Sequence, residues 1–187
     1  MKHVIHFYGP ITPLSFQEFR NVALEAVIKD ASEITILLSS EGGDLNSGFT
    51  AYNFIRNLPV PVTCINMGTI ESIAVPVYLA ADTRLAVKHS RFLLHSFHWG
   101  FNTGIAVDQN RLAEHANSLD YDRERYSLIF NDRTNIAKDI FDIRNCLNGN
   151  SKILDRDEAF QFGITTSSAA PESMIMVNDI HWWPRII

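Results

Sequence analysis

The chain has 187 residues, of which 46% are hydrophobic, and its 16 lysine and arginine residues against 21 aspartate and glutamate residues give a formal net charge of −5. This length and composition fit one globular domain, residues 1–187, and the acidic balance without basic runs argues against a nucleic-acid partner. The longest apolar stretch, residues 73–81, is too short to cross a bilayer, and residues 1–9 lack the features of a signal peptide. We therefore expect a cytoplasmic location and no membrane partner.

Strands and helices are expected to alternate through the first half of the chain. Short apolar runs predict the strands, and periodic apolar positions predict the helices between them. Repeated β-α-β units favour right-handed crossovers and a mostly parallel sheet. Ser15 and Glu18 have the spacing of a capping box at the start of the first helix. The expected strands are residues 4–8, 34–39, 62–65, 83–87 and 91–94, and the expected helices are residues 15–29, 45–58 and 72–81.

The second half of the chain has a different character. Residues 100–104 form a glycine-containing extended segment, and residues 107–134 are polar with apolar side chains at helical spacings. A helix of about 25 residues spans roughly 40 Å, so it either packs along the surface of its own domain or reaches beyond it. Residues 136–147 and 155–162 are expected to form two more helices, the second starting with a capping box of Asp155 and Glu158.

The two cysteines, Cys64 and Cys146, lie in apolar or helical surroundings and lack the spacing of metal ligands. Nothing in the sequence indicates an oxidising compartment, so we expect two buried thiols rather than a disulfide. We expect neither a metal nor a cofactor.

Ser72 is the candidate nucleophile. An apolar strand leads into Gly68, Ser72 follows within four residues, and an apolar helix begins at once. A strand-to-helix turn exposes a serine hydroxyl at the end of a sheet, and it directs the first N–H groups of the helix outward, where they can hold an oxyanion. Because a serine hydroxyl attacks a carbonyl poorly without a base, His95 at the end of the next apolar run is the candidate base.

Three segments in this order resemble the proteolytic subunit of Clp protease: Ser40-Glu-Gly-Gly, Met67-Gly-Thr-Ile-Glu-Ser and Ser90-Arg-Phe-Leu-Leu-His. That family carries Ser-Pro-Gly-Gly, Met-Gly-x-Ala-x-Ser and Ser-Arg-x-Met-Ile-His at closely similar spacing. A Gly-Gly step lets the backbone take positive φ and approach a bound chain closely. The resemblance covers residues 4–165.

The resemblance implies an α/β fold, a ClpP/crotonase-like spiral of β-α-β units with a protruding long helix. It also implies a serine endopeptidase that hydrolyses peptide bonds through an acyl-enzyme, with peptides or unfolded proteins as substrates. The backbone N–H groups of Gly43 and Ile73 match the oxyanion hole of the family. Residues 100–134 match a handle that interdigitates two stacked rings, so we expect a homo-oligomeric ring.

The third member of the catalytic triad is where the chain departs from the family. The aspartate of the family falls on Ser151, with Asn150 beside it, and neither is a carboxylate. A serine or asparagine oxygen can still orient an imidazole, but it does not supply the negative charge that stabilises an imidazolium. Asp155 and Asp157 are nearby carboxylates, although their place at the start of a helix is explained by capping.

Two other functions stay open. In the second interpretation, the chain is a catalytically weak or inactive structural subunit, because it lacks the aspartate of the triad. In the third it is a crotonase-like acyl-CoA enzyme, because Glu71 stands where the family has a small residue and crotonases use glutamates with two backbone oxyanion donors. His98, Trp99 and Phe101 are candidates to line a peptide groove beside the base.

The two ends of the chain also differ from the family. The sequence begins close to the first core strand of the family, so we expect the segment that helps to dock an ATPase unfoldase to be missing. The resemblance leaves open whether such a partner exists. The apolar residues 174–187 form an additional tail that is expected to cover a core face or a subunit contact.

Overall fold

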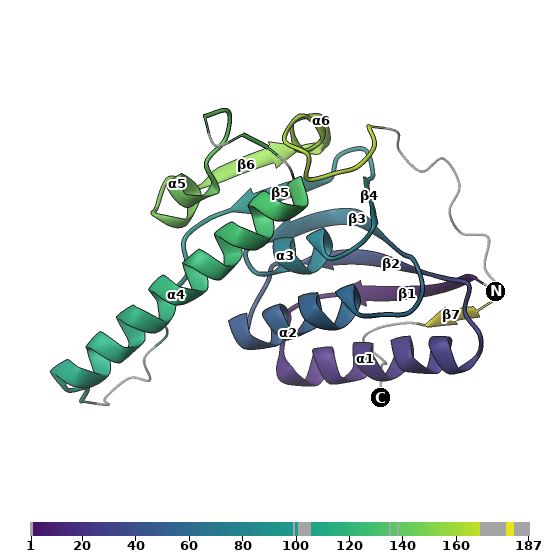
Figure 1. Ribbon diagram of the computed structural model, residues 1–187, viewed down its shortest axis with the longest axis horizontal. Helices are drawn as coiled ribbons and strands as arrows, with labels where there is room; N and C mark the ends of the chain where they lie inside the picture. The colour runs from purple at the N-terminus through teal and green to yellow at the C-terminus, as the bar shows by residue number, and fades with distance from the viewer. Residues whose placement is uncertain are drawn as a thin grey trace.

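A computed structural model describes residues 2–98, 100, 106–134, 136–137, 139–168 and 179–181. Helices α1, α2 and α3 lie against one face of a twisted sheet, and the long helix α4 runs from the sheet out past the other elements (Figure 1). The strands are β1 Lys2–Tyr8, β2 Glu33–Ser40, β3 Val62–Glu71, β4 Thr83–Ala86, β5 Arg91–Leu94, β6 Lys152–Asp155 and β7 Asp179–His181. The helices are α1 Pro13–Ile28, α2 Leu45–Arg56, α3 Ala74–Leu79, α4 Gln109–Thr134, α5 Ile143–Leu147 and α6 Arg156–Gln161.

The sheet is mostly parallel, as the alternation of strands and helices predicts. Its order in the described part of the chain is β6-β5-β3-β2-β1-β7, and β4 pairs with β3 beside this path. Strand β3 is longer than expected because its first half pairs with β4 and its second half with β5. The final pair, β5 with β6, is antiparallel. The mixed α/β fold class is therefore confirmed.

The first helix begins earlier than predicted. Thr12 is its N-cap, and the Thr12 side chain accepts a hydrogen bond from the backbone of Ser15 at the third helical position. Pro13 follows the cap and is suited to the first helical position, because its fixed φ fits a helix and its missing N–H is not needed there. The expected capping box of Ser15 with Glu18 was therefore wrong by one turn.

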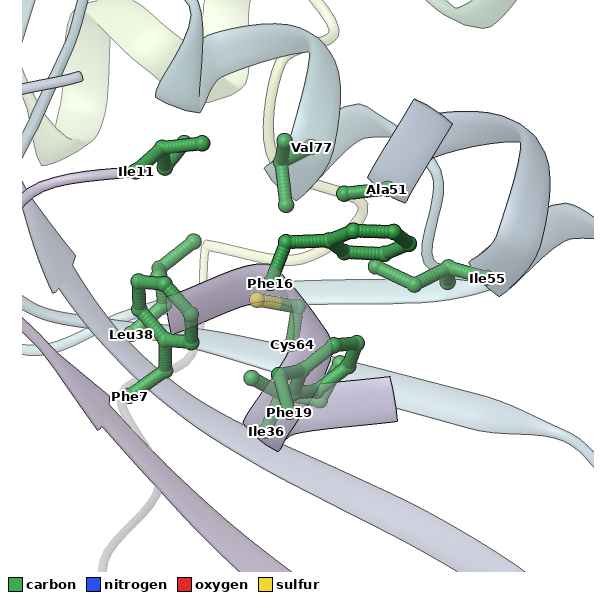
Figure 2. Close-up of a pocket in the computed structure, with 10 residues that line it drawn as sticks. All are labelled: Phe7, Ile11, Phe16, Phe19, Ile36, Leu38, Ala51, Ile55, Cys64 and Val77. Carbon is green, nitrogen blue, oxygen red and sulfur yellow. The ribbon is translucent and has the colours of Figure 1, made fainter. Parts of the chain in front are cut away.

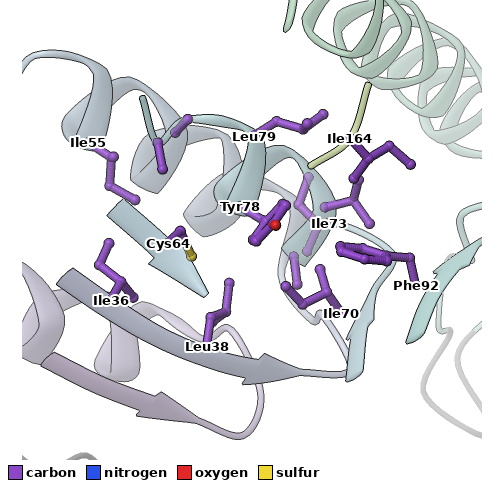
Figure 3. Close-up of a cluster of buried hydrophobic side chains, with 14 of the residues drawn as sticks. Ile36, Leu38, Ile55, Cys64, Ile70, Ile73, Tyr78, Leu79, Phe92 and Ile164 are labelled. Atoms are coloured by element: carbon purple, nitrogen blue, oxygen red, sulfur yellow. The ribbon is translucent and has the colours of Figure 1, made fainter. Parts of the chain in front are cut away.

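The core fills the space between the sheet and its three covering helices. Ile73, Tyr78 and Phe92 pack side by side in it, below the turn that leads from β3 into α3 (Figure 3). The rings of Tyr78 and Phe92 meet edge to face at 5.3 Å, and the Tyr78 hydroxyl donates a hydrogen bond to the Leu85 carbonyl. Fully buried side chains thus support the turn from below. A second cluster of buried apolar residues consists of Val4, Leu37, Ile65 and Leu85.

Helix α4 has 26 residues, which corresponds to about 39 Å. Its buried residues are confined to the part from Asp122 onward, and its N-terminal half stands away from the body of the molecule (Figure 1). The prediction of a long helix that reaches beyond its own core is confirmed. The expected extended segment, residues 100–104, lies largely outside the described residues.

The elements after α4 are shorter than predicted. The helix expected over residues 136–147 is limited to α5, because Asp142 accepts a hydrogen bond from Arg144 N–H and caps the helix just before Ile143. The capping box of Asp155 and Glu158 is confirmed at the start of α6. Strand β6, which precedes this helix, was not predicted.

Arg84 is a buried arginine that ties together three distant parts of the chain. It is only 5% exposed, and its guanidinium donates to the carbonyl groups of Ala81, Arg133, Gly163 and Ile164. Arg133 in turn donates to the Leu79 and Ala81 carbonyls at the end of α3. These bonds fix the C-terminal end of α4 against α3.

Among the residues that the structure describes, no helix is both long enough and apolar enough to span a membrane.

Candidate active site

The predicted site residues gather where three neighbouring parallel strands end. Gly42 and Gly43 follow β2, Ser72 follows β3, and His95 follows β5. Because β2, β3 and β5 are adjacent and parallel, their carboxyl ends share one edge of the sheet. Ligands of open α/β sheets bind at such an edge.

Ser72 occupies a strained turn between β3 and α3. Its φ of 53° lies in the left-handed region that residues other than glycine rarely enter. The Ser72 N–H donates to the Leu93 carbonyl of β5, and the Ser72 carbonyl accepts from the Val75 N–H of α3. The backbone is thus held on both sides of the serine, whose side chain is half-buried.

The glycine pair lies directly against this turn. A Cβ on Gly42 would come within 2.8 Å of Ser72 Cβ, and a Cβ on Gly43 would come within 2.2 Å of the Ile11 carbonyl oxygen. Both glycines have positive φ, at 90° and 145°. Only glycine allows this approach, which explains why the sequence has two of them here.

Two backbone N–H groups beside Ser72 are candidate oxyanion donors. Among the described residues, neither the Gly43 N–H nor the Ile73 N–H donates a hydrogen bond. The Ile73 nitrogen would lie 3.3 Å from a Cβ on Gly42, so the two free donors are close neighbours. Such a pair can hold the negative oxygen of a tetrahedral intermediate.

His95 has the tautomer that a general base needs. Its Nδ1 lies 2.8 Å from the backbone carbonyl oxygen of Ser96. Since a carbonyl can only accept, Nδ1 of the neutral ring carries the proton and Nε2 carries the lone pair. Within the described residues no hydrogen bond joins Ser72 Oγ to His95, and active sites without substrate are often loose in this way.

The structure places Ser151 beside His95. Leu94 pairs with Lys152 at the end of the β5–β6 ladder, so His95 and Ser151 are the next residues along the two strands. No hydrogen bond reaches the His95 ring from Ser151 or Asn150, which are both exposed. Their assignment as the third member stays a prediction.

Asp155 lies at the opposite end of the same ladder. It pairs with Arg91, which is four residues before His95. At about 3.3 Å per strand residue, Asp155 therefore lies roughly 13 Å from His95 along the strand direction. Its carboxylate accepts hydrogen bonds from the Asp157 and Glu158 N–H groups at the start of α6. Capping therefore accounts for Asp155.

Glu71, which precedes Ser72, has two partners. Its Oε1 accepts hydrogen bonds from Arg91 Nη2 and from Thr69 Oγ1, each at 2.8 Å. The Glu71 side chain is only 15% exposed, and the Arg91 guanidinium compensates its charge. This carboxylate ties β3 to β5, the two strands that carry Ser72 and His95.

A surface cavity of about 350 Å³ lies beside the segment that follows the base. Its lining includes Ser96 and Phe97, which follow His95, together with Leu119 and Arg123 of α4. The His98 ring is 5.7 Å from the His95 ring. Trp99 and Phe101, the other candidates for a peptide groove, lie outside the described residues.

A second cavity is apolar and lies between the sheet and helices α1 and α2 (Figure 2). Its volume of about 20 Å³ is enough for about one water molecule. Phe7, Phe16 and Phe19 are among its lining residues. It is a small gap in the packing of the core and cannot admit a peptide.

One contact with the site was not predicted from the sequence. The hydroxyl of Tyr126 in α4 donates a hydrogen bond to the Ser72 carbonyl over 3.3 Å. The spacing of apolar side chains in residues 107–134 predicts a helix that includes Tyr126, but it does not show which backbone group the hydroxyl meets.

Cys64 and Cys146 are both free and buried, as predicted. In the described part of the chain, no group of three histidine, cysteine, aspartate or glutamate side chains is arranged to hold a metal ion.

The chain matches the family model of Clp protease over residues 5–168. It is 32% identical to the ATP-dependent Clp protease proteolytic subunit 2 of Treponema pallidum over 57% of this chain, and this match spans only 52% of that relative. It is also 32% identical to the ATP-dependent Clp protease proteolytic subunit 3 of Rhizobium meliloti, over 72% of this chain and 71% of that protein.

The fold is similar to that of a solved structure, an asparagine-to-aspartate mutant of ClpP1 from Listeria monocytogenes. The TM-score is 0.74 at 20% sequence identity, and the match covers 95% of this chain and 90% of the other. Since the family model extends from the first strand to the end of the segment after α6, the chain belongs to the Clp protease family.

Proposed function

We propose that this protein is a serine endopeptidase of the Clp type, which hydrolyses peptide bonds through an acyl-enzyme. Ser72 Oγ attacks the peptide carbonyl, and His95 Nε2 takes the hydroxyl proton and returns it to the leaving amine. The N–H groups of Gly43 and Ile73 hold the oxyanion. The observation that carries this proposal is Ser72 in a left-handed turn beside two N–H groups that have no acceptor in the described part of the chain.

The third member of the triad is proposed to be Ser151, or Asn150 beside it. In the resting structure the Ser96 carbonyl already holds the His95 Nδ1 proton, so the tautomer does not depend on a carboxylate. A neutral oxygen gives the imidazolium less stabilisation than a carboxylate gives. In the trypsin-type triad, replacing aspartate by asparagine lowers turnover by about 10⁴. We therefore expect slow hydrolysis.

Ser151→Asp tests this arrangement. The substitution puts a carboxylate next to His95 and should raise kcat for a fluorogenic peptide, by up to about 10⁴ if trypsin-type magnitudes apply. Asn21→Asp adds the same charge at an exposed position on α1 and should leave kcat unchanged. Asp155→Asn should also leave it unchanged, because Asp155 caps α6. If Asp155→Asn abolishes activity while Ser151→Asp has no effect, the assignment of Ser151 or Asn150 as the third member is contradicted.

A catalytically weak structural subunit is the second candidate. It is favoured by one observation: no carboxylate contacts the His95 ring in the described part of the chain. If both the wild type and Ser151→Asp, folded and assembled, fail to hydrolyse peptides, this second function is the better one. An acyl-CoA enzyme has less support, since the Glu71 carboxylate is already paired with Arg91.

The same proposal includes assembly and partners. We propose a single domain over residues 1–187, with residues 100–134 as the handle of a homo-oligomeric ring. The half of α4 without buried residues supports this, because it exposes Leu112 and Tyr121. Peptides or unfolded proteins are the proposed substrates and the cytoplasm the proposed location. An ATPase unfoldase remains an optional partner.

A further inference from the structure

Tyr126 links helix α4 to the peptide bond that follows Ser72. The Tyr126 side chain is 1% exposed, and its hydroxyl points at the Ser72 carbonyl oxygen over 3.3 Å. Among the described residues it is the only side chain of α4 that hydrogen-bonds to the turn between β3 and α3. Burial raises the pKa of the Tyr126 phenol well above its ordinary value, so the hydroxyl keeps its proton and acts as a donor.

The geometry of a peptide bond gives this contact a consequence. The Ser72 C=O and the Ile73 N–H belong to one planar unit and point in opposite directions when the bond is trans. A donor that holds the oxygen therefore also helps to fix the direction of the N–H, and here the Tyr126 hydroxyl adds to the Val75 N–H, which donates to the same oxygen. It polarises the peptide as well, which makes the N–H a stronger donor.

The same side chain also contacts the segment of the base. The rings of Tyr126 and Phe97 meet at 5.6 Å with an angle of 61° between their planes, and Phe97 lies two residues after His95. The aromatic ring thus supports the segment that carries the base, while the hydroxyl supports the peptide after the nucleophile. Tyr126→Phe removes only the second contact.

We propose that Tyr126 is a positioning residue, whose hydroxyl orients and polarises the Ser72–Ile73 peptide so that the Ile73 N–H faces the oxyanion. This inference rests on the proposed peptidase function for its effect on catalysis. The bond from Tyr126 to the peptide can nevertheless be measured without any turnover.

A carbonyl-carbon NMR experiment tests the bond directly. Ser72-Ile73 is the only Ser-Ile pair in the sequence, so [1-¹³C]serine and [¹⁵N]isoleucine introduced by cell-free synthesis give one HNCO cross peak. In Tyr126→Phe the carbonyl carbon and the amide nitrogen should both move upfield. The matched control is Tyr121→Phe, which removes the hydroxyl of an exposed tyrosine from the same helix and should leave the cross peak in place.

Peptidase kinetics test the consequence for catalysis. The oxyanion forms only as the reaction proceeds, so Tyr126→Phe should lower kcat by roughly 3- to 10-fold with little change in KM. Tyr121→Phe should behave as the wild type. An unchanged cross peak in Tyr126→Phe, or a shifted cross peak with unchanged kcat, overturns the inference.

Two further outcomes remain interpretable. If the wild type does not hydrolyse peptides, the proposed function fails while the cross peak still decides whether Tyr126 holds the peptide. If Tyr126→Phe does not fold, 3-fluorotyrosine at position 126 keeps the ring and strengthens the donor. It should then move the cross peak downfield, and an unmoved peak would again overturn the inference.

Discussion

Replacing Ser72 by glycine should stabilise the fold relative to replacing it by alanine. Both substitutions remove the hydroxyl, so neither variant should hydrolyse peptides. They differ in the backbone, because Ser72 has a φ of 53° and only glycine takes that conformation without strain. The comparison of Ser72→Gly with Ser72→Ala therefore isolates the strain of the turn from the chemistry of the side chain.

The expected difference follows from two opposing terms. A residue with a Cβ in the left-handed region costs about 1–2 kcal/mol. Glycine loses more conformational entropy on folding, which costs roughly 0.5–1 kcal/mol. The net advantage of Ser72→Gly is thus about 1 kcal/mol, or about 2–4 °C in the melting temperature of a chain of this size.

Thermal unfolding of both variants at one protein concentration measures this difference. The control is Thr50, an exposed position inside helix α2, where the order should reverse. There Thr50→Gly should be about 1 kcal/mol less stable than Thr50→Ala, because glycine is a poor helix former. If Ser72→Gly melts below Ser72→Ala, Ser72 does not occupy a strained left-handed turn and the geometric case for a presented nucleophile fails.

Three other predictions concern the rest of the molecule. Arg84→Met should destabilise the fold by about 3 kcal/mol, because it leaves buried carbonyl groups without a donor; equal melting temperatures would contradict this role. Burial raises the pKa of the Cys64 and Cys146 thiols, so the folded state binds their protons more tightly than the unfolded chain. The contribution of the two thiols to the unfolding free energy should therefore be constant below pH about 8.5 and fall above it, by up to about 1.4 kcal/mol per pH unit for each thiol. Cys64→Ala should flatten the slope above pH about 8.5 in urea titrations. Light scattering at micromolar concentration should give a mass several times the 21.2 kDa of one chain, whereas a monomer would remove the proposed handle.

Periodicity predicts much of this fold because most of its elements have a clear apolar pattern. The boundaries that were wrong depend on single side chains instead. Helix α1 begins at Pro13 because the Thr12 side chain caps it and proline suits the first helical position. Helix α5 begins at Ile143 because the Asp142 side chain caps it there. Strand β6 buries only Leu154 and has a charged residue at each end, so it lacks the apolar run that predicts the equally short β5.

The candidate site also has a part that the sequence predicts and a part that it does not. Gly43, Ser72 and His95 follow strands that are neighbours in the sheet, so a parallel sheet brings them together without knowledge of any side-chain contact. The Tyr126 bond to the Ser72 carbonyl and the Ser96 carbonyl on the His95 ring depend on tertiary geometry, which residue spacing does not encode.

Covalent labelling tests most directly the central claim that Ser72 is a nucleophile activated by His95. The wild type should react with a fluorophosphonate probe, and peptide mapping by mass spectrometry should find one adduct per chain, on Ser72. Ser72→Ala should not react, and His95→Ala should react much more slowly, because the serine proton then has no acceptor. An unlabelled Ser72, under conditions in which an active Clp peptidase is fully labelled, would contradict the account.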